Sequence, residues 1–148
     1  MSHITNTVLM IRPVQFRMNE QTAVNNFYQK NTENILPETV NAKATQEFDT
    51  MVEKLRKATI HVIVVEDTKE FDTPDSIFPN NWISFHKNGT IGLYPMFAKN
   101  RRLERKDSIL EAVESEGFVI ETVVDYTSAE TDNIYLEGTG SILLDREN

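Results

Sequence analysis

The segment Asp75-Ser-Ile-Phe-Pro-Asn-Asn-Trp82 is the first part of the chain whose residue types could carry out chemistry. Asp75 supplies a carboxylate, while Asn80 and Asn81 each supply an amide donor and an amide acceptor. A structural turn accounts well for one asparagine, but less well for the acid, both asparagines and the tryptophan together. The segment is therefore a candidate functional site, with a capped turn as the alternative.

Glu137 is a second candidate. It lies between the apolar stretch Ile134–Leu136 and the glycine turn Gly138-Thr-Gly140. This pattern places a carboxylate at the end of a predicted strand, where it could act on a bound molecule. A turn by itself is the alternative explanation.

The stretch from Lys99 to Lys106 contains five basic residues in eight, although the chain as a whole is acidic. Lys and Arg oppose the macrodipole at a helix N-terminus. We therefore expect its arginines to face an anion such as a substrate carboxylate, which Arg binds through two parallel hydrogen bonds. A solvated helix start is the alternative. A nucleic-acid site is disfavoured because the stretch lacks aromatic residues for base stacking.

The chain contains no cysteine and has three histidines, His3, His61 and His86. Thiolate zinc sites, disulfides and a cysteine nucleophile are therefore excluded within these residues. No two histidines stand at ligand spacing, so we expect no metal site. We predict that His61 is a hydrogen-bonded core residue and that His86 faces solvent.

The first half of the chain predicts two strands joined through a helix. Val8–Ile11 and the β-branched run Ile60–Val65 are the strands, the second one central in its sheet. Val14–Glu38 is predicted to be a long loop with one helical turn around Thr22–Tyr28. A helix follows from about Val40, because its apolar residues form one stripe: Phe48, Met51, Val52 and Leu55.

The second half predicts one β-β-α-β unit. Asn88-Gly89 between two β-rich runs is a strong hairpin signal, and Gly117 is suited to end a helix. The predicted elements are strand Trp82–His86, strand Thr90–Tyr94, helix Arg101–Glu116 and strand Phe118–Val124.

The end of the chain predicts the start of another unit. Ile134–Leu136 and Ser141–Leu144 are its expected strands, followed by turn-forming residues up to Asn148. A final strand with nothing after it would leave an open sheet edge. We therefore expect the domain to continue beyond Asn148, with a frayed terminus as the alternative.

The composition of the 148 residues, 39% hydrophobic and 26% charged, is that of one globular domain. The net charge of −8 argues against general binding to nucleic acid or anionic membranes. No apolar run approaches the roughly 18–20 residues that span a bilayer. The N-terminus has no secretory signal pattern, so a cytoplasmic location is expected.

Several of these segments, taken in order, resemble the pentein superfamily, which includes arginine deiminase, dimethylarginine dimethylaminohydrolase and the amidinotransferases. The amidinotransferase-like branch called citrulline-utilisation hydrolases is the most similar. The segments that carry the resemblance are Asp75-Ser-Ile-Phe-Pro-Asn-Asn-Trp82, the Asn-Gly hairpin, Tyr94-Pro-Met96, Arg101-Arg102-x-Glu104 and Leu136-Glu137-Gly138.

The resemblance implies an α/β fold, the pentein-type propeller of five β-β-α-β units around a pseudo-fivefold axis. Residues 1–148 would form roughly the first half, the N-terminal part of a single catalytic domain. The family cleaves a C–N bond of an arginine- or citrulline-like amino acid through a cysteine covalent intermediate, without a cofactor. The cysteine and its partner histidine would lie beyond Asn148, in the missing C-terminal half of the domain, so this chain alone is expected to be inactive.

The resemblance also implies roles for four residues. Glu137 corresponds to the catalytic carboxylate that supports the histidine and the substrate. Arg101 corresponds to the arginine that holds the substrate's amino-acid carboxylate, and Asp75 to a substrate-side acid.

Asn81 stands where guanidine-binding members usually have an aspartate. A buried carboxylate facing a neutral group would be costly, whereas an amide would not. We hypothesise that the enzyme prefers a neutral ureido substrate such as citrulline. The alternative is that Asn81 only caps a turn.

Hydrolysis is favoured over the alternative, amidino transfer, although these residues do not decide between the two. A different class of function is a non-catalytic interaction half-domain that pairs through its open edge, for example as a homodimer.

Overall fold

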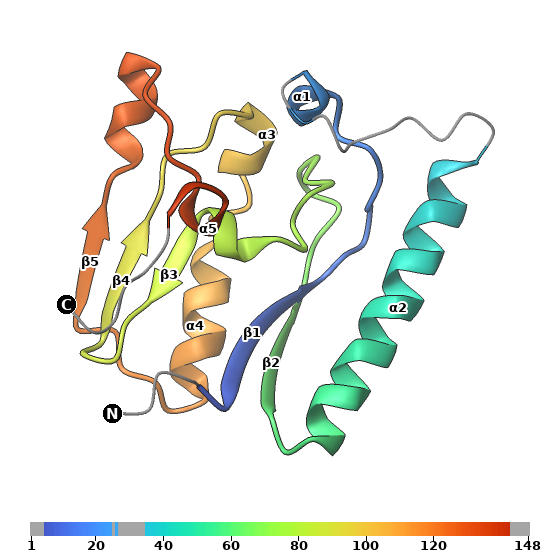
Figure 1. Cartoon of the computed structure of the whole chain (residues 1–148), viewed down its shortest axis with the longest axis horizontal. Helices are drawn as coiled ribbons and strands as arrows, with labels where there is room; N and C mark the ends of the chain where they lie inside the picture. Colours follow the sequence, from blue (N-terminus) through green and yellow to red (C-terminus); the bar gives the residue numbers. More distant parts are fainter. Residues whose placement is uncertain (1–4, 25, 27–34, 143–148) are drawn as a thin grey trace. The chain divides into compact units, whose positions relative to one another are not determined.

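The computed structural model describes residues 5–24, 26 and 35–142 (Figure 1). The chain divides between Phe78 and Pro79 into two compact units. Each unit contains its own sheet, one of two strands and one of three strands. Within the described ranges, none of the helices combines the length and hydropathy needed to cross a membrane.

The first unit is built on a parallel strand pair. β1 (Thr7–Arg12) pairs with β2 (His61–Glu66), with Thr7 opposite His61. Parallel strands need a long crossover connection, and α2 (Pro37–Lys57) supplies it. Phe48 and Val52 of α2 form a buried cluster with Val62 of β2.

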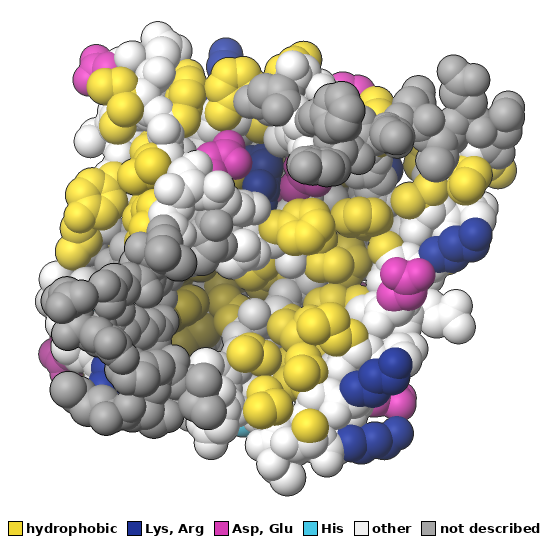
Figure 2. All heavy atoms as spheres, viewed as in Figure 1, with side chains coloured by type: hydrophobic (Ala, Val, Ile, Leu, Met, Phe, Trp, Pro, Cys, Tyr) yellow, Lys and Arg dark blue, Asp and Glu magenta, His cyan; other side chains and the backbone are white. Residues whose placement is uncertain are grey.

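The charged residues of α2 lie on its polar face. Figure 2 shows acidic and basic side chains along this helix, on the side away from its apolar stripe. Arg12 of β1 binds Asp49 of α2 through Nε and Nη2, at 2.8 and 2.9 Å. These hydrogen bonds lower the pKa of the Asp49 carboxyl.

The predicted elements of this unit are confirmed with shifted bounds. The helix begins at Pro37 rather than near Val40, because proline is well suited to the first helical position. The helical turn expected around Thr22–Tyr28 overlaps α1 (Glu20–Ala23), which the Asn19 side chain caps by accepting from the Gln21 N–H. Positions 25, 27 and 28 of that prediction lie outside the described residues.

Two predictions for β2 are wrong. His61 is exposed rather than part of the core, because burial in the strand begins one residue later, at Val62. Among the residues described, β2 pairs with β1 alone and is not a central strand. Val62 of β2 belongs to the cluster that also contains Phe48 and Val52 of α2, and Val64 packs against it.

The second unit contains the predicted β-β-α-β arrangement. β3 (Ile83–Phe85) and β4 (Thr90–Leu93) form an antiparallel hairpin. β4 then pairs in parallel with β5 (Thr122–Asp125), and α4 (Asp107–Ser115) lies in the crossover. Gly89 in the hairpin turn has φ of 77°, a conformation that favours glycine.

The helix predicted over Arg101–Glu116 is two helices. α3 (Lys99–Arg102) ends before α4 begins at Asp107. The basic residues therefore do not occupy the first turn of α4, where Asp107 provides the acid that the helix dipole favours. The break removes the electrostatic conflict that the sequence pattern contained.

The strand predicted over Ile134–Leu136 is absent. The Ile134 N–H donates to Ala129 O and the Leu136 N–H to Pro95 O, so the segment has no strand ladder. Ser141 belongs to the short helix α5 (Gly138–Ser141) rather than to a strand. Residues 143 and 144 of the predicted last strand lie outside the described residues.

Candidate functional site

One end of the three-stranded sheet gathers the polar residues singled out in the second unit. Ile83 at the start of β3 lies opposite Leu93 at the end of β4, and Leu93 lies opposite Asp125 at the end of β5. The 3-10 helix η1 (Pro79–Asn81) precedes β3 at this end. Ligands of open α/β sheets commonly bind outside the carboxyl ends of parallel strands.

Asp125, the last residue of β5, places a carboxylate at this end of the sheet. Its Oδ1 accepts a hydrogen bond from the Thr127 N–H at 2.7 Å. Hydrogen bonds from Thr127 lower the pKa of the Asp125 carboxyl below its usual value. The bond ends β5 and begins the 3-10 helix η2 (Thr127–Asp132).

A buried ion pair links α3 to η1. The Arg101 guanidinium binds Glu104 through Nε and Nη2, at 3.0 and 3.1 Å. Its Nη1 donates to Asn81 Oδ1 at 3.0 Å. Arg101 is 4% exposed and Glu104 3% exposed. The paired hydrogen bonds offset the cost of removing both charges from water.

Gly138 allows the Glu137 turn to contact η1. A Cβ atom on Gly138 would overlap the carbonyl oxygen of Asn80 and would lie 2.8 Å from that of Asn81. A Cβ on Gly140 would lie 3.1 Å from Asn81 Nδ2. Gly138 is therefore required by close backbone approach, whereas Gly140 faces only the side chain of Asn81 at this distance.

Glu137 itself is held by the segment that follows β4. Its Oε1 accepts a hydrogen bond from the Phe97 N–H at 3.2 Å. Within the described part of the chain, Oε2 accepts no hydrogen bond and remains available. We call Asn81, Arg101, Glu104 and Glu137 the strand-end cluster.

The remaining arginines of the basic stretch also face carboxylates. Arg105 binds both oxygens of Glu130, at 2.8 and 3.1 Å, and Arg102 Nε lies 3.4 Å from Glu130 Oε2. The arginines therefore face carboxylates of the protein itself, Glu104 and Glu130, and the predicted contact with a substrate carboxylate stays a prediction. The alternative of a solvated helix start is wrong for Arg101, which is buried.

Asp75 belongs to the other compact unit. It is buried and accepts hydrogen bonds from Asn19 Nδ2 at 2.7 Å and from Thr22 Oγ1 at 3.2 Å. Of the four predicted site residues, Asn81, Arg101 and Glu137 share one unit and Asp75 does not. The predicted roles of all four at a substrate stay predictions.

Sequence reasoning missed the contributions of Glu104 and Asn19. The Arg-x-x-Glu spacing could have identified Glu104, because residues three apart lie on one helical face. Asn19 stands in a stretch predicted as loop, with no local pattern that points to Asp75. Its contact crosses 56 residues of sequence.

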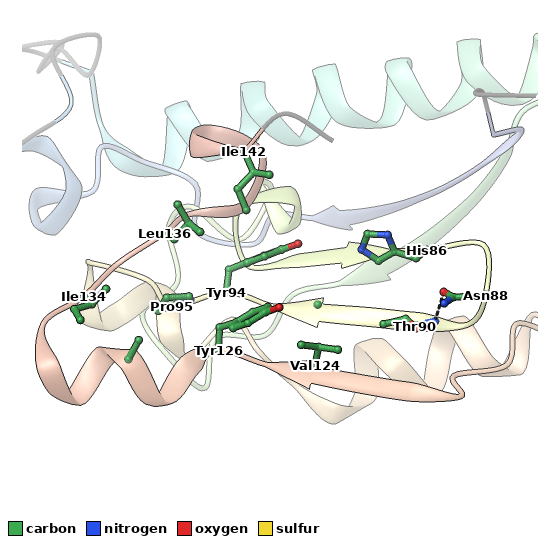
Figure 3. Close-up of a pocket in the computed structure, with 12 residues that line it drawn as sticks. His86, Asn88, Thr90, Tyr94, Pro95, Val124, Tyr126, Ile134, Leu136 and Ile142 are labelled. Atoms are coloured by element: carbon green, nitrogen blue, oxygen red, sulfur yellow. Dashed lines mark hydrogen bonds between the residues drawn. The ribbon is translucent and has the colours of Figure 1, made fainter. Parts of the chain in front are cut away.

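A cavity of about 600 Å³ lies over the sheet of the second unit (Figure 3). Tyr94 and Tyr126 stack beside it with ring centroids 6.2 Å apart. Ser84 Oγ lies 2.7 Å from Tyr94 Oη and 3.0 Å from His86 Nε2. His86 is exposed, as predicted, and lines this cavity.

Across residues 5–24, 26 and 35–142, no three His, Asp or Glu side chains come together as candidate metal ligands. The strand-end cluster instead combines one amide, one available carboxylate oxygen and a neutralised ion pair. Such groups can bind and orient a polar molecule through hydrogen bonds.

Comparisons with known proteins identify the family. A model of the family described as N,N dimethylarginine dimethylhydrolase, eukaryotic, matches residues 12–148. No curated protein matches the chain.

Solved structures of ArgZ, an arginine dihydrolase from the ornithine-ammonia cycle in cyanobacteria, share the fold. The apo structure is 20% identical with a TM-score of 0.65, over 95% of this chain and 19% of that one. A variant of its N-terminal domain covalently bound to a reaction intermediate is 20% identical with a TM-score of 0.62. A Cys-to-Ser mutant bound to substrate is 19% identical with a TM-score of 0.59.

The chain spans 45% of the length of that ArgZ domain and 19% of the longer ArgZ chain. At these identities the likeness establishes the fold, which is the predicted α/β pentein type. The family model covers nearly the whole chain. This chain therefore belongs to the N,N dimethylarginine dimethylhydrolase family of the pentein superfamily.

Proposed function

We propose that this chain is the N-terminal, substrate-positioning part of a hydrolase that cleaves a C–N bond of a guanidino or ureido amino acid. The observation that carries the proposal is the strand-end cluster, in a chain of this family. Asn81, Arg101 and Glu137 come from segments up to 56 positions apart, and the hydrogen bonds and glycine contacts described above bring them to one end of the sheet.

In the proposed reaction this chain positions the substrate, and residues outside it supply the nucleophile and the proton-transfer group. A cysteine thiolate would attack the guanidino or ureido carbon, and water would then release the product from the covalent intermediate. A histidine would transfer the protons. These residues contain no cysteine, so both groups would come from another part of the domain.

Glu137 is the proposed catalytic carboxylate of this chain. One oxygen is held by the Phe97 N–H, which fixes the direction in which the other oxygen points. A carboxylate fixed in this way can orient a histidine or bind a substrate nitrogen. Asp75 and Arg101 are proposed as further substrate-binding residues on the basis of the family resemblance.

A neutral ureido substrate such as citrulline is the proposed preference. Asn81 is a neutral amide, so a substrate guanidinium beside it would gain no charge-assisted hydrogen bond from that position. Amidino transfer to an amine remains the alternative reaction. A non-catalytic interaction half-domain is the alternative class.

The first experiment determines the coding sequence past the Asn148 codon and assays the longest product for release of ornithine from citrulline. We expect further codons for about as many residues again, roughly 150, with a histidine and a late cysteine, since this chain covers 45% of the ArgZ N-terminal domain. A stable chain that ends at Asn148 and releases no ornithine would contradict the proposal in favour of a half-domain.

The second experiment replaces Asn81→Asp in that product. We expect the ratio of kcat/KM for citrulline to kcat/KM for arginine to fall, because a carboxylate pairs with a guanidinium cation. An unchanged ratio would rule out Asn81 as the residue that selects the substrate.

A further inference from the structure

We propose that Glu130 is a positioning residue for Glu137, the proposed catalytic carboxylate. Together with two arginines, Glu130 holds residues 94–97, and this segment in turn orients the Glu137 side chain. The role of Glu130 rests on the proposed function of Glu137, and it is exerted through the backbone rather than on the substrate.

Glu130 lies at the centre of a charge cluster in the second unit. Its carboxylate binds both Nη atoms of Arg105, at 2.8 and 3.1 Å, and lies 3.4 Å from Nε of Arg102. The Glu130 side chain is 11% exposed, and those of Arg105 and Arg102 are 18% and 24% exposed. Low exposure strengthens such charge-assisted hydrogen bonds. The three side chains, which we call the Glu130 cluster, therefore hold one another in place.

The Glu130 cluster binds the backbone that follows β4. Residues 94–97 lie outside the helices and strands, so their position depends on other contacts. Glu130 Oε1 accepts a hydrogen bond from the Met96 N–H at 2.8 Å. The two arginines donate to three carbonyl oxygens of the same segment: Arg105 Nη1 to that of Tyr94 at 3.2 Å, Arg102 Nε to that of Met96 at 3.0 Å and Arg102 Nη2 to that of Phe97 at 3.3 Å.

Residues 94–97 orient Glu137 in turn. The Phe97 N–H donates to Glu137 Oε1 at 3.2 Å, and the Leu136 N–H donates to the Pro95 carbonyl oxygen, also at 3.2 Å. The first bond sets the direction of the carboxylate, and the second holds the backbone that carries it. A change at Glu130 therefore reaches Glu137 through a short series of hydrogen bonds.

A second route joins the Glu130 cluster to the segment that carries Glu137. The Arg102 guanidinium lies 5.7 Å from the ring centroid of Tyr135, within the range of a cation–π contact. The Phe97 and Tyr135 rings meet edge to face, with centroids 5.4 Å apart. Arg102, which Glu130 holds, thus contacts the chain on both sides of the hydrogen bond between Phe97 and Glu137.

The test is E130Q in the longest protein that the gene encodes. Glutamine keeps the volume and an acceptor for the Met96 N–H, but it leaves two partly buried guanidiniums without their carboxylate. We expect kcat for ornithine release from citrulline to fall about tenfold, because a small displacement of a catalytic group suffices for such a loss. KM should stay within about twofold, because the proposed substrate-binding residues Asn81 and Arg101 are bound to each other and to Glu104.

The double variant E130Q/E137Q shows whether Glu130 acts through Glu137. If it does, E130Q should lower kcat by less than about twofold once Glu137 is already replaced, because the effects of residues that act as a unit are not additive. Losses that multiply would overturn the inference, as would a rise in KM for E130Q at unchanged kcat.

The control is D49N, which breaks an ion pair of similar geometry in the first unit. Asp49 there binds Nε and Nη2 of Arg12, and its loss should leave kcat and KM unchanged. If E130Q does not fold, R102K keeps a positive charge beside Glu130 but cannot reproduce the guanidinium fork that binds two carbonyl oxygens. It should lower kcat about threefold, and an unchanged kcat would contradict the positioning role.

A second readout does not depend on activity. In the 148-residue chain, the NMR shift of the Phe97 amide proton should follow the protonation of Glu137, which accepts its hydrogen bond. This response should shrink in E130Q and persist in D49N, and a full response in E130Q would refute the proposed role. An unmutated enzyme that releases no ornithine would contradict the proposed function, while the amide titration still decides the positioning role.

Discussion

Two glutamates of the strand-end cluster are held in different ways. Both oxygens of Glu104 bind the Arg101 guanidinium, whereas Glu137 binds only the Phe97 N–H through Oε1. A carboxylate whose oxygens are both occupied by a buried cation serves structure. One with an available oxygen can serve chemistry.

This difference predicts opposite effects for the two residues. E137Q keeps an acceptor for the Phe97 N–H, so the melting temperature should stay unchanged while ornithine release falls about 100-fold or more. E104L should lower the free energy of unfolding by about 3 kcal/mol, because it removes the carboxylate that neutralises the buried Arg101 guanidinium.

Both variants are made in the longest protein that the gene encodes. Urea unfolding and a citrulline assay of each variant check the two predictions. In the same series, R101M/E104L should recover most of the stability that E104L loses. A stability loss in E137Q as large as that of E104L would show that Glu137 is a structural residue.

At the scale of elements, α5 and η1 meet through a glycine. Gly138 has φ of 25°, and a side chain there would overlap the backbone of Asn80 and Asn81. Gly117, which follows α4, also has a positive φ, of 88°, but nothing lies within 4 Å of the position of its Cβ. A side chain at position 117 would therefore add backbone strain alone, whereas one at position 138 would also overlap neighbouring atoms.

Replacing each glycine by alanine tests this distinction. G117A should cost about 1 kcal/mol, since it adds only the strain of a positive φ. G138A should cost clearly more and should also lower activity, because the turn must move away from η1 and takes Glu137 with it. Urea unfolding measures both costs, and equal costs would show that the contact between α5 and η1 does not constrain the turn.

At the scale of the whole molecule, a net charge of −8 coexists with exposed apolar side chains around the cavity of the second unit. Tyr126 is 54% exposed, Ile134 61% and Leu136 45%. Contiguous exposed apolar surface commonly marks an interaction site, whereas a uniform charge opposes self-association.

We therefore expect the 148-residue chain to bind the dye ANS, which reports exposed apolar surface. I134S/L136S should lower the fluorescence without changing the far-UV circular dichroism, and V24S, in the other unit, should leave it unchanged. Light scattering of the same samples tests the predicted homodimer. Equal fluorescence in all three proteins would mean that the cavity does not bind the dye.

The sequence by itself determined the elements whose signals are local. The Asn88-Gly89 hairpin, the amphipathic stripe of α2 and the β-branched run of β2 depend on periodicity and turn chemistry within a few residues. The family resemblance likewise depends on short motifs. These features needed no knowledge of distant contacts.

Only the tertiary structure decided what the polar residues face. The helix predicted over Arg101–Glu116 is interrupted between α3 and α4, and the arginines of the basic stretch bind Glu104 and Glu130 there. Ile134–Leu136 forms no strand because its backbone bonds to Ala129 and Pro95. Local sequence cannot reveal such partners, since a charge or an N–H group specifies that it needs a partner but not where along the chain that partner lies.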